Sequence, residues 1–158
     1  MRQTVKKTNR LGFALQLGLF GGLFWGGVYL ALEYFRFTRI SLASFLRIFG
    51  SGLERDSLWG TVGGWGLFVV FTIIAALLYV FFLHKIRWPW MGIFYGLVWW
   101  ALIHIWLGPW AKFITPVHKL DINSLTTGMC LFALWGLFIG LSTSFEFTDE
   151  RQREPVQE

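Results

Sequence analysis

Four long apolar runs, separated by shorter polar segments, dominate the amino-acid sequence. The first covers residues 11–32 and the second covers residues 58–83, and neither contains a charged residue. The third and fourth cover about 89–108 and 123–145. Because an α-helix rises about 1.5 Å per residue, runs of about 20 residues reach across a hydrocarbon core of about 30 Å. The pattern therefore predicts an all-α fold, an integral membrane four-helix transmembrane bundle.

Small residues recur at every fourth position within the predicted spans. Glycine and alanine at this spacing let two helix backbones approach closely inside lipid, where tight packing replaces the hydrophobic effect as the force between helices. The first span carries three overlapping units of this kind. We therefore expect the helix-packing positions to be Ala14, Gly18, Gly22, Gly26, Gly60, Gly64, Gly92, Gly96, Gly136 and Gly140.

The polar segment between the first two spans contains an amphipathic stretch at residues 41–50. Its apolar residues follow the spacing of one helical face, at Leu42, Phe45, Leu46 and Phe49. This spacing predicts a short amphipathic interfacial helix lying in the headgroup plane between spans 1 and 2. The alternative is an ordinary loop helix that packs on the bundle.

The connections and ends of the chain predict its topology. The turn at residues 84–87 is so short that the second and third spans must be antiparallel neighbours, and it carries two bases. The amino terminus, residues 1–10, carries four bases and no acid. Because basic segments stay in the cytoplasm, we expect both termini to be cytoplasmic, although Lys and Arg number only eight inside against six outside. The charged tail at 146–158 lacks apolar periodicity and is expected to be disordered.

The approach to the fourth span predicts where that helix begins. The loop at residues 112–124 ends in polar residues just before the apolar run. Such residues accept hydrogen bonds from the first free N–H groups of a helix. We expect Asn123 or Ser124 to be the cap.

Composition places the chain in a bilayer and argues against several activities. Of 158 residues, 55% are hydrophobic and only 15% are charged, whereas a soluble domain carries about 25% charge. The net charge of +5 comes from bases at the ends of the spans, which suits lipid headgroups and gives no continuous stripe for nucleic acid. Cys130 is the single cysteine, which excludes an intrachain disulfide and a CxxC pair.

Two motifs resemble a known family. The first span and its exit read GGLFWGGVYLALEYFRFTRIS, and the fourth span with its approach reads LDINSLTTGMCLFALWGLFIGLSTSFE. These motifs resemble the YqhR family, small conserved membrane proteins of Bacillus-like bacteria, and the similarity covers about residues 12–147. The resemblance implies a four-span protein of the bacterial cytoplasmic membrane. It implies no reaction, cofactor or catalytic residue.

Two polar residues within the spans are candidate functional positions. His104 lies about six residues before Trp110, hence roughly 9 Å inside the membrane boundary. With His118 and Asp121 it would supply two imidazoles and a carboxylate, ligands that suit a divalent metal. The alternative, which we favour, is a neutral structural histidine that hydrogen-bonds a neighbouring helix. Gln16 needs a hydrogen-bond partner for its amide or a place near the interface.

Three function classes remain open on sequence alone. A non-enzymatic structural, regulatory or accessory membrane subunit requires only glycine-lined helix faces. Its partners would be the lipid bilayer and either further copies of the chain or a larger membrane complex. A small transporter or channel acting as a homo-oligomer is the second class, and the prolines and glycines of the spans favour it. A metal-dependent membrane enzyme using His104, His118 and Asp121 is the third. The first class, with no cofactor, requires the fewest assumptions.

Overall fold

The computed structural model describes residues 9–49, 57–83, 88, 90–110 and 120–152. Every regular element in these segments is helical, which confirms the predicted all-α class. The longest are α1 (Arg10–Tyr34), α2 (Leu58–Leu78), α3 (Trp90–Ala101) and α5 (Ile122–Gln152). Shorter ones are the 3-10 helix η1 (Leu42–Phe49), the π-helices η2 (Tyr79–Leu83) and η3 (Leu102–Leu107), and the single turn α4 (Gly108–Trp110).

Four helices are long and apolar enough to cross a membrane, at Arg10–Tyr34, Leu58–Leu83, Trp90–Leu107 and Ile122–Phe147. They correspond to the four predicted runs, with α2 and α3 each continuing into a π-helix. One expectation is wrong in part, because α5 extends to Gln152 and the first residues of the tail are helical. The rest of the tail, residues 153–158, lies outside the described residues, as do residues 1–8 and the turn at 84–87.

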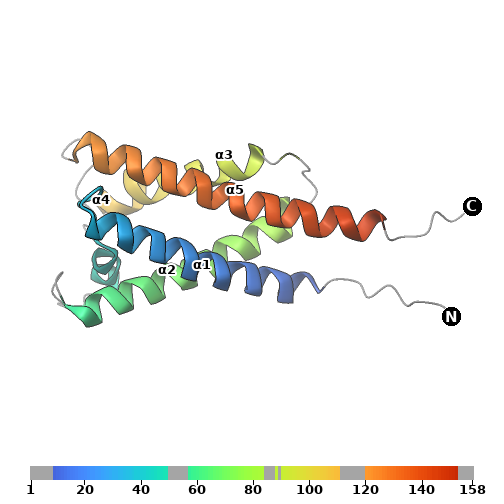
Figure 1. The fold of residues 1–158 in the computed structure, drawn as a ribbon, viewed down its shortest axis with the longest axis horizontal. Helices are drawn as coiled ribbons and strands as arrows, with labels where there is room; N and C mark the ends of the chain where they lie inside the picture. Colours follow the sequence, from blue (N-terminus) through green and yellow to red (C-terminus); the bar gives the residue numbers. More distant parts are fainter. Residues whose placement is uncertain (1–8, 50–56, 84–87, 89, 111–119, 153–158) are drawn as a thin grey trace, which may run out of the picture.

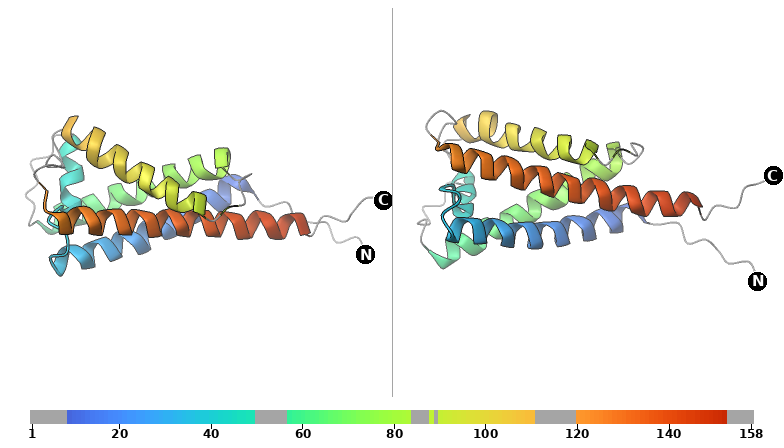
Figure 2. Two further views of the ribbon diagram at one scale, coloured as in Figure 1. Left: turned by 90° about the horizontal axis from the view of Figure 1, so that it is seen from above. Right: turned by 45° about the horizontal axis from the view of Figure 1, so that its top comes forward.

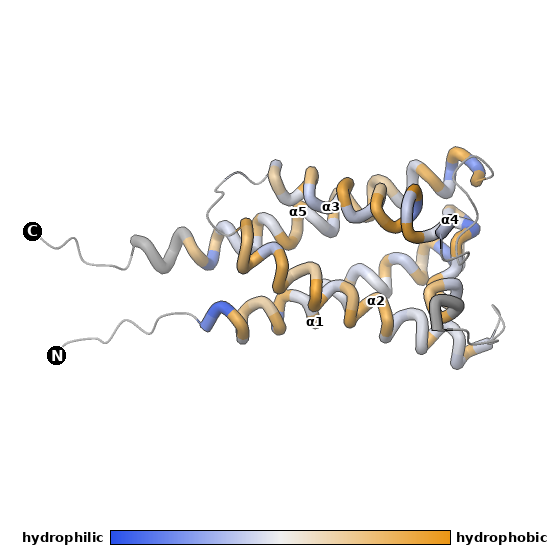
Figure 3. Tube along the Cα trace, turned by 180° about the vertical axis from the view of Figure 1, so that it is seen from behind, coloured by the Kyte–Doolittle hydropathy of each residue, from blue (hydrophilic) through white to orange (hydrophobic). Residues whose placement is uncertain are grey.

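α1 begins and α5 ends at the same end of the bundle (Figure 1). We call this the termini end, and we call the opposite end, where α1 leads into η1 and α5 begins, the loop end. Apolar positions line the helices between the two ends, while hydrophilic residues gather at the ends themselves (Figure 3). This distribution fits a bundle whose long axis crosses the bilayer.

The helices associate as two pairs. α1 packs along α2, and α3 packs along α5, as the two views of Figure 2 show. In the first pair the glycines of α1 face larger residues of α2. A Cβ built on Gly22 would lie 2.7 Å from the Val69 Cα, and one on Gly18 would overlap the backbone of Ile73. Gly26 faces the ring of Trp65.

In the second pair, glycines of both helices face each other. A Cβ built on Gly140 would lie 2.8 Å from the Gly92 Cα, and one built on Gly136 would lie 2.7 Å from the Gly96 Cα. A Cβ on Gly96 would overlap the Phe132 carbonyl. The two backbones are therefore in direct contact, with no side chain between them.

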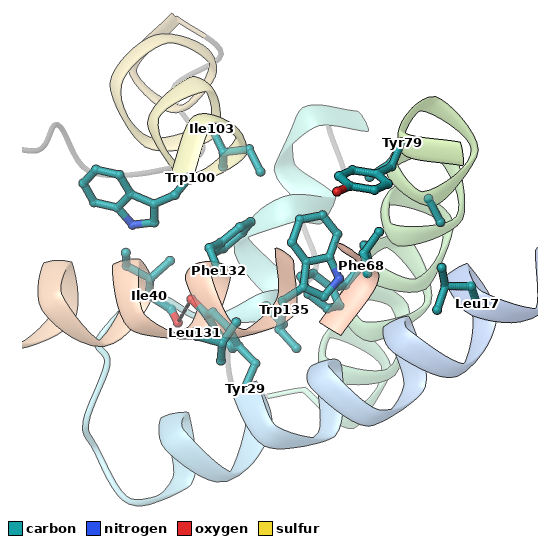
Figure 4. Close-up of a cluster of buried hydrophobic side chains, with 14 residues drawn as sticks. Leu17, Tyr29, Ile40, Phe68, Tyr79, Trp100, Ile103, Leu131, Phe132 and Trp135 are labelled. Atoms are coloured by element: carbon teal, nitrogen blue, oxygen red, sulfur yellow. Dashed lines mark hydrogen bonds between the residues drawn. The ribbon is translucent and has the colours of Figure 1, made fainter. Parts of the chain in front are cut away.

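Aromatic side chains fill the space between the two pairs. Figure 4 shows Phe132 and Trp135 projecting from α5 into this core, with Phe68 and Tyr79 nearby. Trp135 is fully buried and stacks on Phe71, with ring centroids 5.6 Å apart and an interplanar angle of 25°. A cluster of this kind leaves the interior of the bundle packed with rings.

The three remaining predicted packing positions lie elsewhere. Ala14 is fully buried in a small cluster with Val80 and Phe147 near the termini end. Gly60 is buried at the start of α2, and Gly64 faces the backbone of Leu42 in η1. At Gly64, α2 thus packs against the loop-end segment and not against a neighbouring span.

Residues 37–44, which we call the wedge, turn back from α1 and lie across the loop end (Figure 2). Arg36 starts the turn with φ 61°, and the Phe37 N–H bonds to the Leu32 carbonyl, a pattern that ends helices. Within the wedge Ile40, Leu42 and Ala43 are buried.

The amphipathic stretch therefore departs from its expected form. It is a 3-10 helix and not an α-helix, and its apolar residues Leu42 and Ala43 are buried by α2. Glu33 Oε2 accepts a hydrogen bond from the Leu42 N–H at 3.2 Å, which fixes its start. These residues fit the alternative prediction, a loop helix that packs on the bundle. The segment also runs across the bundle axis, the direction expected of a helix in the headgroup plane (Figure 2).

Candidate functional site in the bundle interior

Each π-helix begins beside a carbonyl that accepts a hydrogen bond from a side chain. A π-helix bonds each N–H to the carbonyl five residues back, so the change from α to π disturbs the usual ladder, and such segments are frequent at functional sites. Before η2, the Ala75 carbonyl accepts from the Tyr95 hydroxyl at 2.7 Å. Before η3, the Trp100 carbonyl lies 3.0 Å from His104 Nδ1. Polar side chains of the spans thus stabilise the irregular backbone.

His104 is buried in η3, with 3% of its surface exposed. Because a carbonyl only accepts, the contact with Trp100 requires Nδ1 to carry the proton, so Nε2 of the neutral ring is an acceptor. The imidazole stacks on the Trp100 indole with centroids 5.2 Å apart and meets the Phe132 ring edge-on at 6.1 Å. This environment favours a neutral imidazole, since a charge would be buried among rings.

Several buried polar atoms have no hydrogen-bond partner in the part of the chain that the structure describes. They are Trp25 Nε1, Trp100 Nε1, Trp135 Nε1 and Thr143 Oγ1. Buried polar groups are satisfied in most proteins, so each of these needs a physical explanation. Trp100 stacks on the His104 imidazole, and Trp135 stacks on the Tyr95 ring.

Asp121 serves as the cap of α5. Its Oδ2 accepts from the Ser124 N–H at 3.2 Å, and its Oδ1 accepts from the Ser124 hydroxyl at 2.9 Å. The hydroxyl of Ser124 lowers the pKa of the Asp121 carboxyl below its ordinary value, helped by the nearby Arg39, whose Nε lies 3.9 Å away. The expected caps, Asn123 and Ser124, are therefore wrong, because the residue before α5 takes that role.

The same cluster joins the two helix pairs. Ser124 Oγ accepts from the Arg39 N–H at 2.9 Å, which ties the wedge to α5. The Tyr29 hydroxyl donates to the Ile40 carbonyl at 3.0 Å, which ties the wedge to α1 (Figure 4). The wedge is thus hydrogen-bonded to one helix of each pair.

The other predicted polar residues do not assemble into a site. Gln16 lies exposed on the outer surface of α1, with no hydrogen bond to another described residue. His118 lies outside the described residues, so its expected approach to His104 stays a prediction. Within the described segments, no group of three His, Cys, Asp or Glu residues is placed to hold a metal ion.

Sequence reasoning did not single out Trp100 or Gly128, and it named Ser124 only as a possible cap of the fourth span. Gly128 stands two turns before Gly136, so it extends the noted row of small residues on α5 past Phe132. A Cβ built on Gly128 would lie 3.0 Å from Trp100 Nε1. The spacing of Trp100 and His104 on one row of α3 was visible, but their partner on another helix was not.

The fold and its interior define a class, a multi-pass integral membrane protein built from two glycine-packed helix pairs. The family described as "Conserved membrane protein YqhR" matches residues 1–158, and the chain belongs to this family. The chain is 35% identical over 132 residues to "Uncharacterized protein YqhR" of Bacillus subtilis (strain 168), which covers 84% of this chain and 74% of that protein. No solved structure matches the chain.

Proposed function

We propose that this protein is a non-enzymatic structural, regulatory or accessory subunit that binds another membrane protein, or further copies of itself, through its lipid-facing helix surfaces. The observation that carries the proposal is the packed interior. Helices meet there through backbone contacts, as between Gly92 and Gly140, and through stacked rings such as Trp135. The buried His104 imidazole is hydrogen-bonded to the Trp100 carbonyl. Such an interior leaves the outer surface as the place for specific contacts.

Site-specific photocrosslinking in cells tests this proposal. A photoreactive phenylalanine analogue would replace one exposed phenylalanine on each helix, at Phe20, Phe82, Phe94 or Phe145, which are 62% to 76% exposed. We expect a defined protein adduct, either a partner or a second copy, from one or two neighbouring helices. Phe132, only 1% exposed, is the interior control and should crosslink within the chain. Adducts to lipid alone from all four positions would contradict the proposal.

We further propose that the bundle lies in the bacterial cytoplasmic membrane with both termini in the cytoplasm. Exposed tryptophans at the two ends support a bilayer position, since tryptophan prefers the interface. Trp88 and Trp90 lie at the termini end and Trp106 and Trp110 toward the loop end, all 69% to 81% exposed. The basic amino terminus and the basic turn at 84–87 support the orientation.

Cysteine accessibility tests the orientation. In a Cys130→Ser background, Ser51→Cys should react with a membrane-impermeant thiol reagent in whole cells, and Gln157→Cys should react only after the cells are broken. The reverse pattern would invert the topology.

The second candidate is a small transporter or channel that acts as a homo-oligomer. The π-helices η2 and η3 favour it, because irregular backbone within spans is common around transport sites. Reconstituted liposomes would distinguish the two candidates. A solute or ion flux that requires the protein would favour transport over a binding role.

A further inference from the structure

Gln16 presents an amide on the lipid-facing side of α1. It is exposed and makes no hydrogen bond to a described residue. Two other polar side chains of the spans are satisfied within the chain, since the Thr72 hydroxyl donates to the Phe68 carbonyl at 2.9 Å and the Tyr95 hydroxyl donates to the Ala75 carbonyl at 2.7 Å. An amide offers two N–H donors and a carbonyl acceptor, and placing them in hydrocarbon without partners is costly.

Gln16 lies within the apolar part of the span and not at its end. It stands about six residues after Arg10, where α1 begins, which is roughly 9 Å along the helix axis. Two methylene groups are too short to return the amide to the level of Arg10. The neighbouring side chains on the same side of α1, Leu15 and Leu19, are 43% and 47% exposed. The amide is therefore surrounded by surface that faces lipid.

The residues in line with Gln16 form an open strip. They follow one another at helical spacings of three and four, so they share the side of α1 that faces away from the bundle. Leu23 is 48% exposed, and a Cβ built on either glycine of the strip would have no neighbour closer than 3.8 Å outside the backbone of α1. Glycines at such positions let a second helix approach closely in lipid. We call this line the outer strip: Gly12, Gln16, Leu19, Leu23 and Gly27.

The geometry points to a second copy of this chain as the molecule that covers the outer strip. Copies of one chain insert in the same orientation, so their α1 helices are parallel and Gln16 lies at the same depth in both. Around a two-fold axis along the membrane normal, each amide donates an N–H to the carbonyl oxygen of the other. Any other partner would have to supply a donor and an acceptor at this depth. The inference rests on the proposed function, to which it adds the surface and the partner.

Cysteine crosslinking of the full-length protein in its own membrane tests the contact. In a Cys130→Ser background, Leu23→Cys places a thiol on the outer strip, and mild oxidation should link two copies through a disulfide. Val70→Cys is the matched control, because Val70 is 53% exposed on α2, away from the strip. We expect it to give no linked dimer.

Variants of Gln16 test whether the amide stabilises the dimer. Energy transfer between labelled copies in liposomes, at several ratios of protein to lipid, gives the association constant. Gln16→Leu should lower that constant about tenfold, because both reciprocal hydrogen bonds are lost. Gln16→Asn keeps an amide and should lower it less. The circular dichroism spectrum should stay unchanged in both variants, since the side chain is exposed.

Two results would overturn the inference. One is equal dimer yield from Leu23→Cys and Val70→Cys, and the other is an association constant that Gln16→Leu leaves unchanged. Photocrosslinking from Phe20, 74% exposed beside the strip, separates this inference from the proposed function. An adduct to a different protein would overturn the second copy as the partner and still support a binding role. Lipid adducts alone from every exposed phenylalanine tested would contradict both.

Discussion

The two helix pairs solve the same packing problem in different ways. In α1/α2 only one helix supplies the glycines, and Gly18, Gly22 and Gly26 form a groove that receives Ile73, Val69 and Trp65. In α3/α5 both helices supply them, and the backbones touch at Gly92, Gly96, Gly136 and Gly140. In the first pair, glycines of one helix lie against the backbone of Ile73 and Val69 and against the Trp65 ring, and in the second pair the glycine backbones of both helices meet directly.

This difference predicts how each pair tolerates an added methyl group. In lipid, helix association depends on close van der Waals contact and on hydrogen bonds. Where the atom opposite a glycine belongs to a flexible side chain, that side chain can move. Where the atom belongs to the opposing backbone, the whole helix must shift. The loss of stability caused by each Gly→Ala substitution should therefore depend on which atoms lie opposite that glycine.

The largest effect is expected at Gly96→Ala. The new methyl group would overlap the Phe132 carbonyl, so α3 and α5 must separate along their contact. We expect a loss of about 3 kcal/mol in the free energy of unfolding, measured by reversible unfolding in detergent micelles. Gly66→Ala is the matched control, because nothing lies within 4 Å of a Cβ there. Equal stability of the two variants would show that α3 and α5 do not meet at Gly96.

A smaller loss is expected at Gly22→Ala in the other pair. Its methyl group would lie 2.7 Å from the Val69 Cα, a closer approach than normal packing allows. The overlap with the Val69 Cα is shallower than the overlap of Gly96→Ala with the Phe132 carbonyl, so a smaller shift of α1 relieves the strain. We expect a loss of about 2 kcal/mol in the free energy of unfolding, measured in the same assay. A loss larger than that of Gly96→Ala would reverse the ranking of the pairs.

Removing a hydrogen bond that joins the two helix pairs should lower the free energy of unfolding by less than either glycine substitution. Ser124→Ala deletes the acceptor for the Arg39 N–H and the donor to Asp121, which loosens the wedge from α5. We expect a loss of about 1 kcal/mol. Hydrogen exchange should also quicken at the Arg39 amide and leave the amides of α2 unchanged. Unchanged exchange at Arg39 would mean that the wedge does not depend on Ser124.

The smallest effect is expected at Gly26→Ala. The methyl group meets two side chains, the ring of Trp65 and, at 3.2 Å, the ring of Phe68, and Trp65 can rotate away at the expense of its 3.4 Å hydrogen bond to the Gly22 carbonyl. We expect a loss of less than about 1 kcal/mol, with a shift of the Trp65 fluorescence or indole resonance. A loss as large as that of Gly22→Ala would show that the ring is held rigidly.

Much of this fold could be predicted from the sequence. The length of each apolar run follows from the thickness of the hydrocarbon core, so the four spans were recognisable from composition alone. The small residues at every fourth position also marked which faces of α1, α3 and α5 could approach another helix. Their partners were not predictable, because a row of glycines does not say which helix lies opposite.

The remaining features depend on contacts between distant segments. Residues 42–49 have helical spacing in sequence, and they form a 3-10 helix whose start lies against α2 at Gly64. Asp121 was a candidate metal ligand, yet it caps α5 through Ser124. His104 was recognisable by its type, but the sequence does not show that Gly128 of α5 lies beside it.

The most direct test is solid-state nuclear magnetic resonance on protein in lipid bilayers, with carbon-13 placed only at glycine Cα positions. Direct backbone contact predicts cross-peaks between α3 and α5, joining Gly96 to Gly136 and Gly92 to Gly140. The glycines of α1 should show no such cross-peak to a glycine of α2, because they face Ile73, Val69 and Trp65. Dilution with unlabelled protein should leave the relative intensities unchanged. Absence of the α3/α5 cross-peaks, or equally strong ones between α1 and α2, would contradict the two modes of packing.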